Sequence, residues 1–225
     1  MIRSIALLLA ALSVTAAAQP PASGPAASEL KAALVGSKAG YTKVHTVAAR
    51  ASRFASGGTA VADWAFSALP ARCRTAATTG LLWDPKVVAR FPKSPAAVVE
   101  FSGRHALGES LISVPESLPD SLFHVRVPKG CANVRVAYQG RRVRVKIAPL
   151  TSAELPDIPG ASVSGVKTTL PPGLWGHDKG AQKVLIVVRD GNLVLETYAD
   201  AFGPVGDVSS DWTTASWARA RARLT

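Results

Sequence analysis

The stretch AQKVLIVVRDGNLVLETYADAF, residues 181–202, carries the clearest structural signal in the chain. Residues 184–188 are an unbroken apolar run, which is typical of a strand covered on both faces. An Asp-Gly pair at 190–191 supplies a turn, and the Asn that follows tolerates a positive φ. From residue 193 onward the side chains alternate with a period of two. The stretch therefore predicts a β-hairpin with one central strand and one less buried strand.

A second hairpin is predicted by NVRVAYQGRRVRVKI, residues 133–147, which alternates on both sides of a short Gln-Gly turn. The alternation places Val and Ile on one face and basic residues on the other. These basic residues are Arg135, Arg142, Arg144 and Lys146. They are candidates for binding an anion, although the solvated outer face of a sheet shows the same pattern. No aromatic residue alternates with them, so the stacking platform of a nucleic-acid groove is missing, and we expect no nucleic-acid partner.

The N-terminus predicts export. Residues 1–18 combine a short positive start, an apolar core and a small-residue ending, which is the pattern of a cleaved signal peptide. The apolar core is too short to span a bilayer and no later run is long enough, so we expect no transmembrane segment after cleavage. The protein is therefore expected to be periplasmic or secreted. The net charge of +11 then favours anionic partners of the cell envelope.

The chain contains two cysteines, Cys73 and Cys131. An even number of cysteines in an exported protein indicates a disulfide, here one that ties an early segment to the strand preceding the second hairpin. On the chain-entropy model a loop of this length stabilises the fold by about 4 kcal/mol. The histidines are scattered without metal-ligand spacing, and no cofactor motif is present, so we expect neither a metal nor a cofactor.

The pattern of short Val-, Leu- and Phe-bearing runs divided by Pro, Gly and Ser predicts an α+β fold with a β-rich N-terminal domain. The expected organisation is a signal peptide (1–18), a flexible leader with a short helix starting at Ser28 (19–40), a β-rich domain with one disulfide (41–150), a Pro-, Gly-, Ser- and Thr-rich linker (151–173) and a last segment (174–225).

Residues 178–223 resemble the opening of the β-lactamase-related serine hydrolases, which include class C β-lactamases, penicillin-binding proteins and aminohexanoate-oligomer hydrolases. The resemblance is carried by an apolar strand, Arg-Asp-Gly, a second apolar strand, Glu-x-Tyr and Phe-Gly-Pro. In that family such a hairpin leads through a short loop to Ser-x-x-Lys at the start of a buried helix. The corresponding residues here are SWAR, so the resemblance implies Ser216 as candidate nucleophile and Arg219 at the lysine position. It also implies hydrolysis of a small-molecule amide or ester.

The chain departs from this family at its catalytic residues. A guanidinium stays protonated, so Arg219 is not a competent base. The family's Tyr-x-Asn or Ser-x-Asn motif and its Lys-Thr-Gly or His-x-Gly strand lie beyond the end of this sequence, and an activated serine needs both a base and oxyanion donors. The resemblance therefore predicts an incomplete α/β segment, truncated or degenerate and inactive as this chain. A frameshift in a GC-rich gene would also explain the Ala-Arg repeat at 218–223.

Two functional hypotheses follow from these observations. The first is an exported, incomplete serine hydrolase with an extra β-rich domain. The second is a complete small binding protein, a disulfide-tied β domain whose basic face binds an anionic ligand of the envelope. A purely structural envelope component is a third possibility, which no residue favours or opposes.

Overall fold

The computed structural model describes residues 24–56, 69–138, 140–172 and 180–224. Within them, the chain forms one antiparallel sheet of eight strands in the order β1-β2-β3-β8-β7-β6-β5-β4. The strands are β1 (Thr42–Arg50), β2 (Pro95–Ser102), β3 (Ala106–Ser113), β4 (Asn133–Tyr138), β5 (Arg141–Pro149), β6 (Ser162–Leu170), β7 (Ala181–Asp190) and β8 (Leu193–Phe202).

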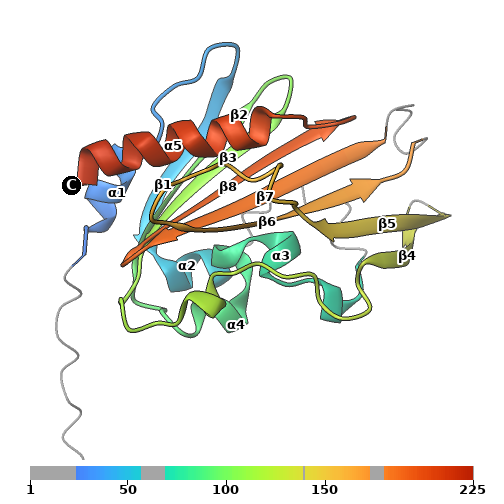
Figure 1. Ribbon diagram of the computed structural model, residues 1–225, viewed down its shortest axis with the longest axis horizontal. Helices are drawn as coiled ribbons and strands as arrows, with labels where there is room; N and C mark the ends of the chain where they lie inside the picture. The colour runs from blue at the N-terminus through green and yellow to red at the C-terminus, as the bar shows by residue number, and fades with distance from the viewer. Residues whose placement is uncertain (1–23, 57–68, 139, 173–179, 225) are drawn as a thin grey trace, which may run out of the picture.

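Helices cover both faces of this sheet (Figure 1). The helices α1 (Ala27–Ala33) and α5 (Val208–Leu224) lie on one face. The other face carries α2 (Ala51–Ser56), α3 (Ala76–Thr79) and α4 (Pro85–Val88), together with the short 3-10 turns η1 (Ala71–Cys73), η2 (Leu81–Trp83) and η3 (Asp120–Leu122). The predicted α+β class is confirmed.

The hairpin predicted from residues 181–202 is present as β7 and β8, and it forms the centre of the sheet. Its two-residue turn uses Gly191 at a φ of 57°, a conformation that glycine adopts without steric cost. The expectation that one strand would be less buried was wrong, because β8 lies between β7 and β3 and both strands are buried along almost their whole length.

The α5 side of the sheet holds a core in which α5 and α1 pack on the central strands. Trp212 of α5 is buried against Phe101 of β2, with ring centroids 5.7 Å apart, and its indole N–H donates to the backbone oxygen of Gly108 at 3.0 Å. The resemblance predicted an incomplete segment at residues 174–225, but α5 is packed against β7, β8 and α1. The α1 helix begins at Ala27, one residue before Ser28, where the short helix was expected to start, and its N-cap is Ala26.

The β4–β5 hairpin also matches the prediction from its alternating sequence. Its Val and Ile side chains pack on the Cys73–Cys131 disulfide, whose Cα atoms are 5.6 Å apart, so the predicted disulfide is confirmed. This disulfide-bearing core lies on the same face as α2, α3 and α4, because Ile147 pairs with Thr168, and Thr168 pairs with Lys183, in register.

The segment boundaries expected from the sequence can be compared with the order of the strands in the sheet. Strand β6 lies inside the segment expected to be a linker, residues 151–173, and the sheet continues from β5 through β6 into β7. The predicted signal peptide, residues 1–18, lies outside the described residues. Among the helices that the structure describes, none has the length and apolarity needed to cross a membrane.

Candidate functional site

The basic face is the outward side of the β4–β5 hairpin, defined by Arg135, Arg142, Arg144 and Lys146. All four side chains are exposed, because they alternate with the Val and Ile residues buried on the disulfide. On β5 they occupy every second position, a spacing of about 6.7 Å along the strand. Arg135 stands directly opposite Arg144 across the hairpin. In the part of the chain that the structure describes, none of the four forms an ion pair or a side-chain hydrogen bond.

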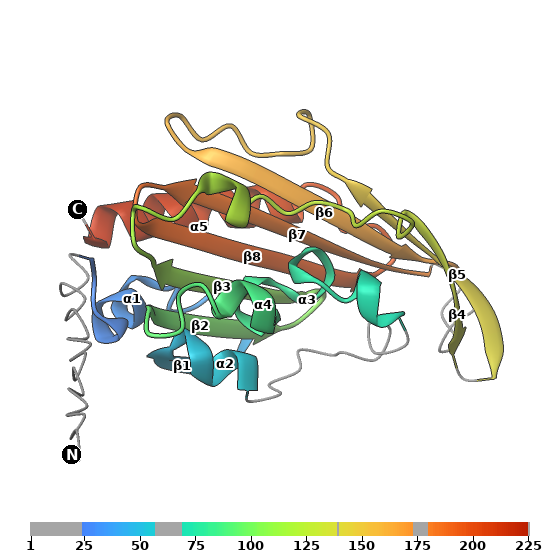
Figure 2. The ribbon, with the colours of Figure 1, turned by 90° about the horizontal axis from the view of Figure 1, so that it is seen from below.

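Like charges placed directly opposite each other on a sheet repel, so this arrangement does not stabilise the hairpin by itself. The hairpin is stabilised on its other face, where the Val and Ile side chains pack on the disulfide. Figure 2 shows β4 and β5 extending beyond the helices at one end of the sheet. The hairpin register therefore fixes the backbone positions of the four cations, and their side chains remain open to a ligand.

The basic face continues across the sheet to a pocket. Lys146 of β5 pairs in register with Thr169 of β6, and Thr169 pairs with Gln182 of β7. Residues paired in this way point to the same side of the sheet, so Lys146 and Gln182 lie on one surface, separated by two strand spacings of about 4.8 Å each. Gln182 lines the pocket.

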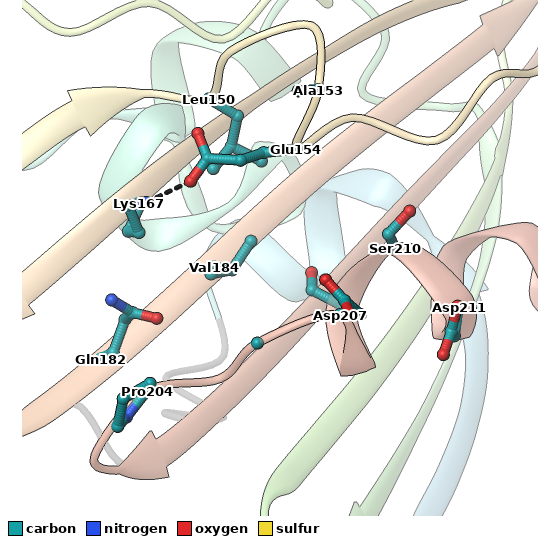
Figure 3. Close-up of a pocket in the computed structure, with 12 residues that line it drawn as sticks. Leu150, Ala153, Glu154, Lys167, Gln182, Val184, Pro204, Asp207, Ser210 and Asp211 are labelled. Atoms are coloured by element: carbon teal, nitrogen blue, oxygen red, sulfur yellow. Dashed lines mark hydrogen bonds and ion pairs between the residues drawn. The ribbon is translucent and has the colours of Figure 1, made fainter.

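This pocket has a volume of about 520 Å³ and lies between β6, β7, the loop after β5 and the beginning of α5 (Figure 3). Its lining residues are Leu150, Ala153, Glu154, Lys167, Gln182, Val184, Pro204, Gly206, Asp207, Ser209, Ser210 and Asp211. They come from four separate parts of the chain, and no local motif marks them. Sequence reasoning therefore missed this pocket.

One side of the pocket is closed by an ion pair. Figure 3 shows Glu154 on the loop and Lys167 on β6 pointing toward one another, and their charged groups are in contact. The hydrogen bond from Lys167, together with one from the Thr151 backbone N–H, lowers the pKa of Glu154 from 4.5 to about 2. This carboxylate therefore stays ionised, and its charge is compensated by the lysine.

The two residues implied by the hydrolase resemblance lie elsewhere, on α5, where Ser216 faces the sheet and Arg219 reaches the end of α1. Ser216 is fully buried, and its hydroxyl donates to Oε2 of Glu109 on β3 at 3.2 Å. The Val35 backbone N–H donates to the same oxygen at 3.1 Å, and burial raises the pKa of Glu109 to about 7. Arg219 donates from Nε to the Leu34 backbone oxygen at 2.9 Å. Both side chains thus join α5 to its neighbours, and Ser216 has no surface on which a substrate could reach it.

The opposite face of the sheet carries a second set of buried polar groups that the sequence did not reveal. Glu196 of β8 accepts the Leu81 backbone N–H at 2.5 Å, and burial raises the pKa of this carboxyl to about 7. Glu100 of β2 lies 3.3 Å from His45 of β1. Burial raises the pKa of Glu100, while His45 acts in the opposite direction. Among the described residues, no group of three or more His, Cys, Asp or Glu is arranged to hold a metal ion.

Comparison with protein-family models and with curated protein sequences gives no match. Among solved structures, the extracellular domain of PknH from Mycobacterium tuberculosis is similar, with a TM-score of 0.53 and 13% identity over 90% of this chain and 98% of that one. The Rv0999 ortholog from Mycobacterium smegmatis aligns with a TM-score of 0.45 and 15% identity over 89% of this chain and 98% of that one. The likeness to the PknH domain concerns the fold alone.

These comparisons correct the functional interpretation drawn from the hairpin. The resemblance to β-lactamase-related serine hydrolases was wrong, since no family model matches the chain and a solved structure that shares its fold is the extracellular domain of PknH. The strands that carried the resemblance are the middle of a single antiparallel sheet. The interpretation of this chain as a truncated, inactive hydrolase is wrong for the same reason.

Proposed function

We propose that this protein is an exported binding domain that uses its basic face to hold an acidic glycan of the cell envelope. The observation that carries the proposal is a set of four exposed cations to which the described residues offer no partner. They lie on one side of a hairpin whose other side packs on the disulfide. A protein with a net charge of +11 attracts polyanions from a distance, and such a face gives that attraction a defined place.

Export is supported by two features of the chain. The signal-peptide pattern at residues 1–18 is an N-terminal address for secretion. The Cys73–Cys131 disulfide is a bond that persists in oxidising compartments such as the periplasm. The similar PknH structure is described as an extracellular domain, which agrees with this location.

The shape of the basic face favours an extended ligand over a compact one. Cations at every second residue of β5 form a line with a spacing of about 6.7 Å, and they do not converge on one point. A small anion is held best by donors that converge, whereas a linear polymer can meet charges in a row. An acidic polysaccharide lying along β5 would contact Arg142, Arg144 and Lys146 in succession.

The test is a salt series with polygalacturonate as the probe and uncharged dextran as the reference polymer. Log affinity should fall linearly with log salt concentration, because each neutralised charge on a polyanion releases counterions. The double variant R142S/R144S should lower the magnitude of that slope by about two, close to one for each lost contact. The matched control is R90S/R223S, which removes two exposed arginines outside the hairpin and should leave the slope unchanged.

Three outcomes would overturn the proposal. Equal binding to dextran and polygalacturonate would show that charge is not recognised. Equal loss of slope in R142S/R144S and in R90S/R223S would show that net charge acts without any particular face. Strong binding to vesicles of phosphatidylglycerol with none to polygalacturonate would replace the glycan by a membrane surface.

A further inference from the structure

Two of the four cations of the basic face stand directly opposite each other. Arg135 of β4 and Arg144 of β5 are paired in register, so their Cβ atoms are about 5 Å apart on the same side of the sheet. Arg142 and Lys146, the other two, stand opposite uncharged residues of β4. Within the basic face, two positive charges therefore converge only at the Arg135–Arg144 pair.

This pair carries a cost that the described residues do not offset. Both side chains are exposed, and in the described structure neither forms an ion pair or a side-chain hydrogen bond. Like charges directly opposite each other destabilise an antiparallel strand pair. The buried Val and Ile side chains explain how the hairpin packs, but they do not explain two facing arginines. An anion placed between the guanidinium groups would replace their repulsion by two attractions.

The chemistry of arginine decides which anion fits best. A guanidinium is a planar fork that donates two parallel N–H bonds to an oxyanion. A carboxylate has two oxygens and one charge, so it satisfies one fork. A phosphate monoester has three terminal oxygens and a charge of about −1.5 to −2 near pH 7, so it can accept from both forks and compensate both cations. The pair therefore matches a phosphate group better than a carboxylate.

We propose that Arg135 and Arg144 together bind a phosphate monoester carried by the envelope glycan, and that this pair is the anchor of the basic face. The inference rests on the proposed function, because it assigns a phosphorylated glycan to that same face. Arg142 and Lys146 lie on either side of Arg144 along β5, so they would contact the polymer next to the phosphate as single charges.

The probe is glucose 6-phosphate. The reference compounds are glucuronate, which has a similar ring with one carboxylate, and uncharged glucose. Binding is followed by amide chemical shifts of the isotope-labelled protein at constant ionic strength, because salt screens exposed charges. We expect glucose 6-phosphate to shift amides of residues 133–146 with a Kd of about 10 mM, roughly tenfold tighter than glucuronate. Glucose should cause no such shifts.

The variants R135Q and R144Q each leave a single guanidinium and should weaken glucose 6-phosphate binding by about tenfold. R142Q is the matched control, because it removes the same charge from β5 and keeps the pair, so its affinity should stay within about twofold of the parent. Without ligand, R135Q should raise the melting temperature by about 1 °C, since it removes the repulsion between the arginines.

A pH comparison separates the phosphate from the protein. The second pKa of a phosphate monoester is about 6, so glucose 6-phosphate should bind more tightly at pH 7.5 than at pH 5. Glucuronate keeps one charge at both pH values, and its affinity reports any change in the protein itself.

Equal affinity for glucose 6-phosphate and glucuronate, equal losses in R135Q and R142Q, or shifts confined to residues outside 133–146 would each overturn the proposal. A lower melting temperature in R135Q would also contradict it, because the pair would then stabilise the free protein. The salt series with polygalacturonate is an independent readout. If that series behaves as expected while the pair does not prefer phosphate, only the phosphate anchor is refuted. If polygalacturonate binds no better than dextran, the basic face itself fails.

Discussion

The buried carboxyls Glu109 and Glu196 should make this protein less stable at pH 8 than at pH 5. Burial raises the pKa of each from 4.5 to about 7, in spite of the hydrogen bonds that each accepts. In the unfolded chain both groups ionise at their ordinary pKa. Between these values the folded state binds more protons than the unfolded state, so the free energy of unfolding falls as the pH rises.

The magnitude follows from the size of the rise in pKa. A change from 4.5 to about 7, at 1.36 kcal/mol per pKa unit, corresponds to about 3 kcal/mol for each carboxyl once the pH exceeds 7. Two such groups give about 6 kcal/mol, a large share of the 5 to 15 kcal/mol by which proteins are usually stable. The raised pKa values of Glu100 and Asp200 act in the same direction. The lowered pKa of His105 opposes them only below its ordinary value of 6.5.

The perturbation is replacement of either carboxyl by its amide, E109Q or E196Q. In E109Q the amide oxygen can still accept from the Val35 N–H and the Ser216 hydroxyl. In E196Q it can still accept from the Leu81 N–H. Neither amide ionises, so each variant should lose about half of the decline between pH 5 and pH 8. The double variant should lose most of the decline, and the raised pKa values of Glu100 and Asp200 should account for what remains.

The assay is urea unfolding at pH 5, 6, 7 and 8, with the free energies compared at a constant m-value. E116Q is the control, because this exposed carboxyl should leave the pH dependence as it is. The reasoning is refuted if the parent chain is equally stable at pH 5 and pH 8, or if E109Q/E196Q declines as steeply as the parent.

Three further substitutions test other parts of the fold. C73S/C131S should lower the free energy of unfolding by about 4 kcal/mol, as the chain-entropy model gives for a loop of 58 residues, and reducing agent should then have no added effect in a thermal melt. G191A should cost about 1 kcal/mol in urea unfolding, because alanine at a φ of 57° is strained although its methyl group meets no atom. S216A should lower the free energy of unfolding by about 1 kcal/mol. The loss should be larger at pH 8 than at pH 5, because the hydrogen bond from the Ser216 hydroxyl favours the ionised form of Glu109. An equal loss at both pH values would contradict this interpretation.

The two hairpins could be predicted from sequence because their information is local. In both, a period-two pattern continues across a short turn, so strand, turn and register are fixed within about 20 residues. The pairing of β3 with β8 joins residues 106–113 to residues 193–200, and no local pattern specifies it. That pairing makes β8 central and not peripheral. The pocket was missed for a related reason, since its walls meet only when β6, β7 and α5 are assembled.

The burial of Glu109 and Glu196 could not be predicted, because the same sequence pattern occurs in strands with one solvated face and in strands covered on both faces. Glu109 and Glu196 each stand next to a polar residue, Ser110 or Thr197, and a carboxylate beside a polar residue in a strand ordinarily indicates a solvated position. Here helices cover both faces of the central strands, so the alternate positions are buried as well. The sequence of neither strand indicates that helices cover its second face, because those helices come from distant parts of the chain.

Helix packing also explains Ser216 and the Arg-rich tail without any chemistry. The sheet-facing stripe of α5 contains small residues at 209, 213, 216 and 220, spaced by four, three and four, which is the period of one helix face. Small side chains let the helix approach the strands closely while the two tryptophans fill the space on either side. The arginines then project from the other positions, where Arg221 pairs with Asp190 of the β7–β8 turn at 2.8 Å. A serine after a hairpin and a basic residue three positions later are thus what a closely packed terminal helix on a sheet requires, and a nucleophile motif is not needed to account for them.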